Sequence, residues 1–127
     1  MLRYALALAL LISPAVATAA DKTAYDTAIE HAELFDQLGD TLLTGVSALL
    51  DTGSDAADVC PDLESAALDW NKAAGFYDQA IAAPKDAKDT ARASDAVLTD
   101  ARDFSLKKAS EGQRLFDTYC KGVKAPG

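Results

Sequence analysis

The chain has two cysteines, Cys60 in its middle and Cys120 near its end. In an oxidising compartment such a pair is more often bonded than free. A Cys60–Cys120 disulfide would close a loop of roughly 60 residues and stabilise the fold by about 4 kcal/mol on the chain-entropy model. An intermolecular bond is the competing interpretation, whereas a redox pair is disfavoured because the sequence has no Cys-x-x-Cys. The pair therefore predicts that the end of the chain is tied to its middle.

Residues 1–20 have the layout of a secretory signal peptide. Arg3 precedes the apolar run Tyr4–Ile12, Pro14 breaks the helix, and the small residues 17–19 suit a signal peptidase. The apolar run is shorter than the roughly 20 residues that a membrane span needs. The cleavage site lacks the cysteine of a lipoprotein. We therefore expect cleavage near Ala20, a periplasmic or secreted protein, a single domain over 21–121 and a flexible tail over 122–127.

The charge of the chain is strongly acidic. Its 127 residues include 12 Lys and Arg against 20 Asp and Glu, for a formal charge of −8, and loss of Arg3 with the signal peptide makes it −9. Such a field opposes binding to nucleic acid and to anionic membranes, because both require positive charge. It favours a protein partner with a basic surface, or cations. Plain solubility is the simpler explanation of the same excess.

Apolar residues that recur every three or four positions predict three helices. The helices cover Thr23–Leu50, Asp62–Ala83 and Asp86–Lys121. Asp21 or Thr23 suits the cap of the first, Pro61 the first position of the second, and Asp86 the cap of the third. The residues expected to face inward are, in chain order, Ala24, Ala28, Phe35, Leu38, Leu42, Val46, Leu49, Leu63, Ala66, Trp70, Ala73, Tyr77, Ala80, Ala93, Val97, Ala101, Phe104, Ala109, Gly112, Phe116 and Tyr119.

Three antiparallel helices with small connections predict an all-α, up-down three-helix bundle with one disulfide. The connector Asp51–Cys60 has room for a short fourth helix over Asp55–Val59. With these bounds the third helix would outreach the second by about 20 Å. The connector would then pack over that overhang so that Cys60 meets Cys120. A Cα–Cα separation above about 7 Å would rule this arrangement out.

Haem is the first cofactor to consider for a small exported bundle. In length, export and helical pattern alone, the chain resembles the cytochrome c-prime bundles and their b-type counterparts. Covalent attachment needs Cys-x-x-Cys-His, which the sequence lacks, and the only Met is the initiator. His31 is the one usual axial ligand left. We therefore expect no haem.

Metal binding has weak support in the sequence. His31 borders the apolar stripe of the first helix and is best explained as a structural histidine. Asp51, Asp55, Asp58 and Asp62 form an acidic cluster that could attract calcium, but the glycine and the bidentate glutamate of an EF-hand loop are missing. Helix capping explains these acids more simply. His31 with Asp51, Asp55 and Asp58 is retained as an alternative metal site.

No catalytic motif is present, neither a nucleophile elbow, nor a phosphate-binding glycine loop, nor a zinc motif. We expect no catalytic residues and no enzymatic activity. Most aromatic residues fall on the expected inward faces, but Phe76 does not, and it marks either a partner surface or a wider core face. The preferred function is binding of another protein, as an inhibitor, immunity protein or adaptor, with homodimerisation left open. The alternative is a carrier of a small ligand or metal that uses His31, acidic residues or the aromatic interior.

Overall fold

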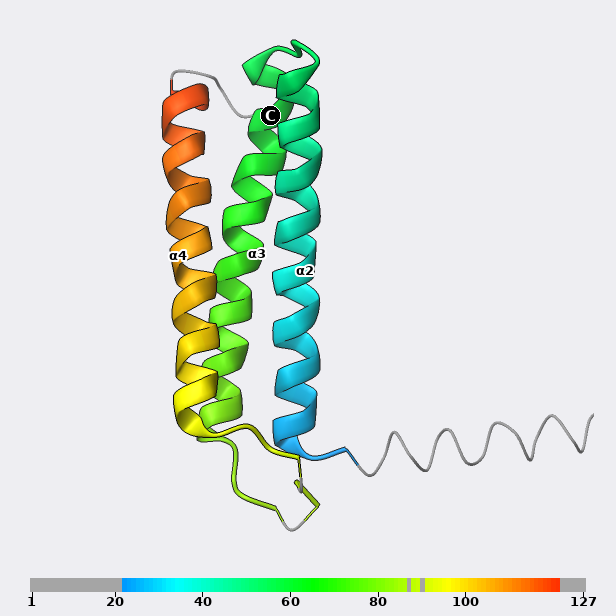
Figure 1. Ribbon diagram of the computed structural model, residues 1–127, viewed down its shortest axis with the longest axis vertical. Helices are drawn as coiled ribbons and strands as arrows, with labels where there is room; N and C mark the ends of the chain where they lie inside the picture. Colours follow the sequence, from blue (N-terminus) through cyan, green and yellow to red (C-terminus); the bar gives the residue numbers. More distant parts are fainter. Residues whose placement is uncertain (1–21, 87, 90, 122–127) are drawn as a thin grey trace, which may run out of the picture.

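The computed structural model describes residues 22–121 except 87 and 90. This part of the chain contains three helices, α2 (Ala24–Asp51), α3 (Ala56–Ala82) and α4 (Asp95–Cys120), and no strand. The helices run side by side in alternating directions with α3 between the other two (Figure 1). The predicted all-α three-helix bundle is confirmed. The expected signal peptide and flexible tail lie outside the described residues.

Helix α2 begins where the sequence predicts. The hydroxyl of Thr23 accepts a hydrogen bond from the backbone N–H of Asp26 at 3.1 Å, which caps the helix. The predicted buried stripe of this helix is partly wrong, because Leu38 and Leu49 are 42% and 41% exposed. Small residues occupy much of the buried face instead, and one of them, Gly39, leaves room for Trp70 of α3. The buried residues of α2 are Tyr25, Ala28, Ala32, Gly39 and Val46.

Helix α3 begins at Ala56, six residues before the predicted start, and Pro61 lies inside it. The expected short fourth helix is therefore the first part of α3. Val59 and Cys60 are buried against Cys120, and this packing holds residues 56–60 in helical conformation. Pro61 is the sixth residue of α3, past the four N–H groups that have no partner within a helix, so it removes one hydrogen bond that the helix would otherwise form.

Helix α4 begins at Asp95 and not at Asp86. The hydroxyl of Ser94 accepts a hydrogen bond from the N–H of Val97 at 3.2 Å and so provides the cap. Because α3 has 27 residues and α4 has 26, the predicted overhang does not exist. The expected inward face of α4 is also partly wrong. Val97, Phe104 and Tyr119 are exposed, and the buried residues are Leu98, Ser105, Ala109, Gly112 and Cys120.

The disulfide between Cys60 and Cys120 is confirmed, with a Cα–Cα separation of 5.7 Å. It joins the second turn of α3 to the last residue of α4. Val46, Val59 and Leu63 bury it at the end of the bundle where α2 gives way to α3. All three helices therefore meet around the bond.

Trp70 occupies the centre of the bundle. Its side chain projects from α3 and lies between Gly39 of α2 and Gly112 of α4, and the residue is 1% exposed. A Cβ atom at Gly39 would lie 2.5 Å from Nε1 of Trp70, and one at Gly112 would lie 3.1 Å from its Cζ3. The indole N–H donates a hydrogen bond to Asp40 at 3.0 Å. These two glycines therefore make the space that the largest core side chain fills.

Candidate functional site

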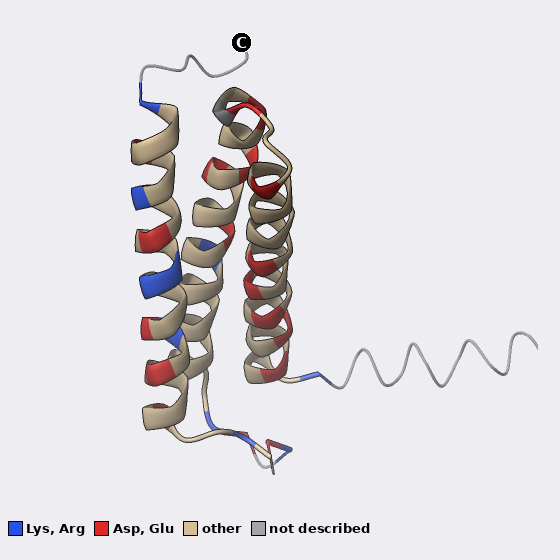
Figure 2. Cartoon of the chain, turned by 45° about the horizontal axis from the view of Figure 1, so that its top comes forward, with Lys and Arg blue, Asp and Glu red and all other residues tan. Residues whose placement is uncertain are grey.

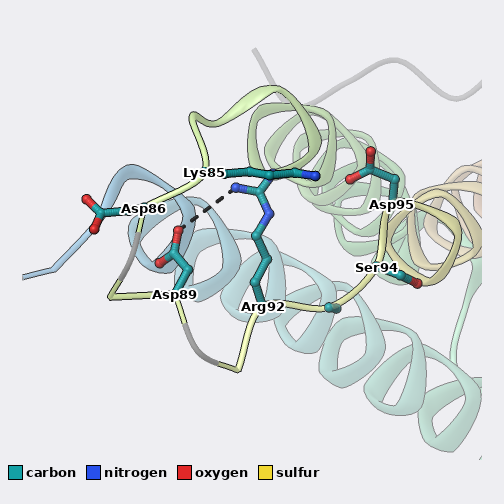
Figure 3. Close-up of a pocket in the computed structure, with 7 residues that line it drawn as sticks. Lys85, Asp86, Asp89, Arg92, Ser94 and Asp95 are labelled. Atoms are coloured by element: carbon teal, nitrogen blue, oxygen red, sulfur yellow. Dashed lines mark ion pairs between the residues drawn. The ribbon is translucent and has the colours of Figure 1, made fainter.

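A hollow of about 450 Å³ lies under the loop that joins α3 to α4, at the end of the bundle away from the disulfide (Figure 3). Its lining carries charges of both signs, from Lys85, Asp86, Asp89, Arg92 and Asp95, together with Ala93 and Ser94. Two of these side chains, Arg92 and Asp89, are almost fully buried. Their contacts decide whether this hollow is a binding site or a structural joint.

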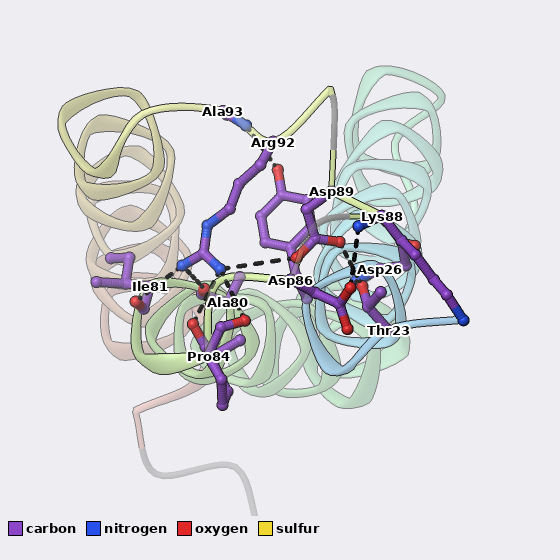
Figure 4. Close-up of polar contacts among 12 residues, drawn as sticks. Thr23, Asp26, Ala80, Ile81, Pro84, Asp86, Lys88, Asp89, Arg92 and Ala93 are labelled. Atoms are coloured by element: carbon purple, nitrogen blue, oxygen red, sulfur yellow. Dashed lines mark hydrogen bonds and ion pairs between the residues drawn. The ribbon is translucent and has the colours of Figure 1, made fainter. Parts of the chain in front are cut away.

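The side chain of Arg92 binds the C-terminal end of α3. Its guanidinium donates hydrogen bonds to four backbone carbonyls of the last turn and the following residues, and it lies over the ring of Tyr25 at 4.9 Å (Figure 4). The carbonyls at a helix end have no partner within the helix and carry partial negative charge, so a buried cation there is stabilising. The four carbonyls belong to Ala80, Ile81, Ala83 and Pro84.

Asp89 joins the same loop to the start of α2. It accepts a hydrogen bond from the hydroxyl of Thr23 at 2.6 Å, and its second oxygen lies 3.9 Å from Arg92 without a hydrogen bond to any described residue. The backbone N–H of Ala93 donates to the hydroxyl of Tyr25 at 3.0 Å. The loop thus fastens the end of α3 to the beginning of α2. The residues around the hollow therefore have a structural role, because their contacts hold the loop against α2 and α3.

A polar cluster bridges α2 and α4 beside Trp70. The ammonium of Lys108 lies 2.8 Å from Asp36 and 2.8 Å from Asp40, and the hydroxyl of Ser105 donates to Asp36 at 2.9 Å. Burial alone lowers the pKa of Lys108, but the hydrogen bonds and charges of the two carboxylates outweigh it, and the net pKa is raised. Lys108 is therefore held as a cation that ties the two outer helices together.

Tyr77 lies near this cluster on α3. Burial raises the pKa of its phenol, the negative charges of Asp36 and Glu33 raise it further, and Lys108 partly offsets them. A phenol with a raised pKa is a poor nucleophile and a poor base at neutral pH. The polar cluster therefore has the character of a structural bridge.

A second hollow, of about 270 Å³, lies between α2 and α4 near the disulfide. Most of its lining residues are apolar, and Asp51 is the one charged residue among them. The lining residues are Leu43, Val46, Ser47, Leu50, Asp51, Leu63, Leu115 and Tyr119. A space of this size and polarity can take one apolar group with a positive end.

The residues of the alternative metal site are not brought together. His31 is exposed and contacts the ring of Phe76 at 4.9 Å, whereas Asp51 lies 20 residues further along α2, at a distance of about 30 Å. Asp55 precedes α3 and Asp58 lies in its first turn. Within residues 22–121, leaving aside 87 and 90, no three His, Cys, Asp or Glu side chains form a group that could hold a metal ion.

Phe76 lies at the outer edge of the contact between α2 and α3. Its ring stacks on Phe35 at 5.5 Å, and the ammonium of Lys72 lies 5.2 Å from the Phe35 ring. Phe76 is half-buried, so it covers part of the helix contact and still presents an edge to the surface. From this aromatic group the surface continues along α2 over Leu38, Leu42 and Leu49.

Sequence reasoning missed the two cation clusters. Neither Arg92 nor Lys108 belongs to a motif, because their partners lie on other elements. A signal does exist for Lys108, whose position three residues after Ser105 places both on one side of α4. No local pattern identifies Arg92, because its partners are backbone carbonyls.

Searches of protein-family models, of curated proteins and of solved structures returned no match for this chain. The site must therefore be judged from its own geometry. Of the three described helices, none has both the length and the apolar character that crossing a membrane requires.

Proposed function

We propose that this chain is a non-enzymatic binding protein, exported from the cytoplasm, that recognises another protein with a basic surface. One observation carries the proposal. Leu38 and Leu49 of α2 are exposed, Asp62 and Asp69 of α3 form no ion pair with any other described residue, and neither pair has an evident role in holding the bundle together. An apolar centre with charged neighbours is the usual composition of a protein-binding surface.

The distribution of charge supports this proposal. The charged residues of α2 are all acidic, whereas Lys and Arg are concentrated on α4 (Figure 2). A surface with one sign of charge speeds encounter with a partner of opposite sign and suppresses contact with like-charged proteins. Fast capture of a basic protein suits an inhibitor, an immunity protein or an adaptor.

The disulfide supports export, because such bonds persist in the periplasm and outside the cell and are rare in the cytosol. The layout of residues 1–20 points the same way. Together these two observations support a periplasmic or secreted place of action.

The proposal is tested by crosslinking the protein in its own host and identifying what is attached. Adducts with a basic protein are expected at low ionic strength, and their yield should fall as salt is added because exposed charges are screened. A variant in which the charges of residues 122–127 are neutralised would serve as a control for nonspecific binding. Absence of any protein adduct at low salt, from correctly oxidised protein, would contradict the proposal.

A small-ligand carrier is the second candidate, and the hollow of about 270 Å³ favours it. The apolar wall and Asp51 would suit a small apolar molecule with a cationic group. Native mass spectrometry of protein purified from its host tests this alternative. An added mass that is lost in a Leu115→Trp variant would support a carrier, and a bare monomer would count against it.

A further inference from the structure

From the outer surface of α2 and α3, we infer that this chain binds an amphipathic helix of its partner, with apolar residues on one face and a row of Lys or Arg along one edge. The inference rests on the proposed function and names the surface and the kind of partner that it requires. We call this surface the α2–α3 seam. It consists of His31, Phe35, Leu38, Leu42, Gly45 and Leu49 of α2 with Asp58, Asp62, Ser65, Asp69, Lys72 and Phe76 of α3.

The α2 row has the spacing of a helix-binding stripe. Its members follow one another in steps of four, three, four, three and four residues, which is the alternation that keeps apolar residues on one side of a coiled-coil helix. The row runs from His31 to Leu49, which is 19 residues and about 27 Å of helix. Leu38 and Leu49 are exposed, and Phe35 and Leu42 are only half-buried, so α3 does not cover it. The row therefore offers room for about five turns of another helix.

The α3 row has the same alternation of four and three and runs alongside in the opposite direction. The stacking of Phe35 on Phe76 fixes the register at one end, and the packing of Leu42 against the core cluster that contains Ala66 and Trp70 indicates it further along. Asp58, Asp62 and Asp69 accordingly lie beside the leucines.

Those three carboxylates form no ion pair or side-chain hydrogen bond with another residue of the described chain. Asp62 and Asp69 are half-buried, so their charge is less screened than that of a fully exposed acid. A row of Lys or Arg on the incoming helix would meet them at matching spacing.

The charges also set the direction of the partner helix. Acids occupy the half of the seam nearer the disulfide, and Lys72 stands in the aromatic half beside Phe35. A helix with its basic residues toward the acidic half and a neutral or acidic residue opposite Lys72 is complementary in one orientation only.

A second copy of this chain is a poor occupant of the seam. Two copies would bring their acidic rows and their acidic α2 helices together, and each chain has a formal charge of −8. Like charges across an interface are destabilising. A basic amphipathic helix meets the same apolar row without that repulsion.

Gly45 allows a sharp test because it lies within the α2 row and a Cβ atom there would meet nothing within 4 Å. Gly45→Arg should place a long cation on the seam and leave the bundle intact. Gly75→Arg is the matched control, since Gly75 also has open space and is in the middle of a helix but lies outside the α3 row. Both variants add the same charge and should raise the melting temperature, because Arg is a better helix former than Gly.

The probe is a labelled synthetic peptide of about six turns, with Leu at coiled-coil spacing, Lys along one edge of the half that meets the acids, and a neutral residue opposite Lys72. Its companion carries Glu at every Lys position. Fluorescence anisotropy should show salt-dependent binding of the Lys peptide only, weakened at least about tenfold by Gly45→Arg and unchanged by Gly75→Arg. Equal effects of the two variants, equal binding of the two peptides, or no binding of the Lys peptide to the parent protein would overturn the inference.

Crosslinking in the host separates this inference from the proposed function. A basic protein that still attaches to the Gly45→Arg variant as well as to the parent would leave the proposed function standing and remove the seam as its site. Loss of the adduct from Gly45→Arg alone would support both.

Discussion

Trp70 of α3 contacts two glycines, Gly39 of α2 and Gly112 of α4, and so links all three helices. Glycine weakens a helix, and a helix-strengthening change would be expected at any such position. Here the space matters more than the propensity, because the indole already fills the volume that a side chain would need. The two glycines of α2 that the sequence could not distinguish, Gly39 and Gly45, therefore have opposite roles.

Substitution of these two glycines by alanine should shift stability in opposite directions. Gly39→Ala places a Cβ 2.5 Å from the indole and should destabilise by about 1–3 kcal/mol through overpacking. Gly45→Ala meets no atom and should stabilise by up to about 1 kcal/mol. Urea unfolding of the oxidised protein measures both. A gain in stability for Gly39→Ala would show that Trp70 does not hold this position.

Lys108 of the polar cluster and the neighbouring Tyr77 should make the free energy of unfolding decrease at alkaline pH. The pKa values of Tyr77 and Lys108 are raised above their ordinary values of 10.0 and 10.5. A raised pKa means that the folded state holds the proton more tightly, so the contribution to stability is complete at lower pH and is lost as pH rises through the folded pKa. The free energy of unfolding should therefore fall as pH increases above about 10.

The variant Lys108→Met isolates the lysine contribution. It should flatten the alkaline decline relative to the parent, because the lysine that titrates there is removed while Asp36 and Asp40 keep their hydrogen bonds from Ser105 and Trp70. Urea midpoints at several pH values between 8 and 12 provide the measurement. A variant whose midpoints fall as steeply as those of the parent would mean that Lys108 does not titrate with unfolding.

At the scale of helices, local signals decided some boundaries and tertiary contacts decided others. Thr23 could be identified as a cap from its own hydroxyl, and the existence of three helices followed from apolar spacing. The start of α4 could not, because Asp86 is as good a cap as Ser94 and tertiary contacts of Asp89, Arg92 and Ala93 hold the loop before α4. Pro61 suggested that α3 starts at the proline, whereas the helix starts at Ala56. The burial of Val59, which keeps this earlier segment helical, cannot be read from the sequence.

The α2–α3 seam also depends on tertiary contacts that the sequence does not reveal. The sequence singled out Phe76 as lying off the inward face, and the structure places it on the edge of the α2–α3 contact. The apolar period of α2 was clear, but the choice between two adjacent stripes was not, because small residues made the closer contact with α3. Residue size, and not hydrophobicity alone, decided which stripe was buried.

Removal of Arg92 should loosen the end of α3. Arg92→Ala leaves four carbonyls without this donor and should cost about 2–3 kcal/mol, because hydrogen bonds to a buried charged group are stronger than neutral ones. Hydrogen exchange should accelerate at the N–H groups of residues 80–83 and at Ala93, whose N–H bonds to Tyr25. Arg114→Ala, which removes only an exposed pair with Glu111, is the control and should change little. Unchanged exchange in the loop would contradict the capping role.

For the whole molecule, the disulfide provides a constraint that a small bundle needs, because few large side chains are fully buried. Replacement of both cysteines by serine, which removes the 60-residue closure, should lower the free energy of unfolding by about 4 kcal/mol. Thermal unfolding of this variant beside the oxidised and reduced parent provides the measurement. Equal melting temperatures for the variant and the oxidised parent would show that the bond adds nothing.

The whole surface also explains why binding is the preferred function. The buried and polar-bridge residues account for the bundle, whereas the exposed leucines and unpaired acids of the seam do not contribute to it. The most direct measurement places a photo-crosslinking amino acid at position 45, or at position 75 as the control, in protein exported by its own host. The account predicts an adduct with a basic protein from position 45 that weakens with added salt, and little or none from position 75. No adduct from either position, or equal adducts from both, would contradict it.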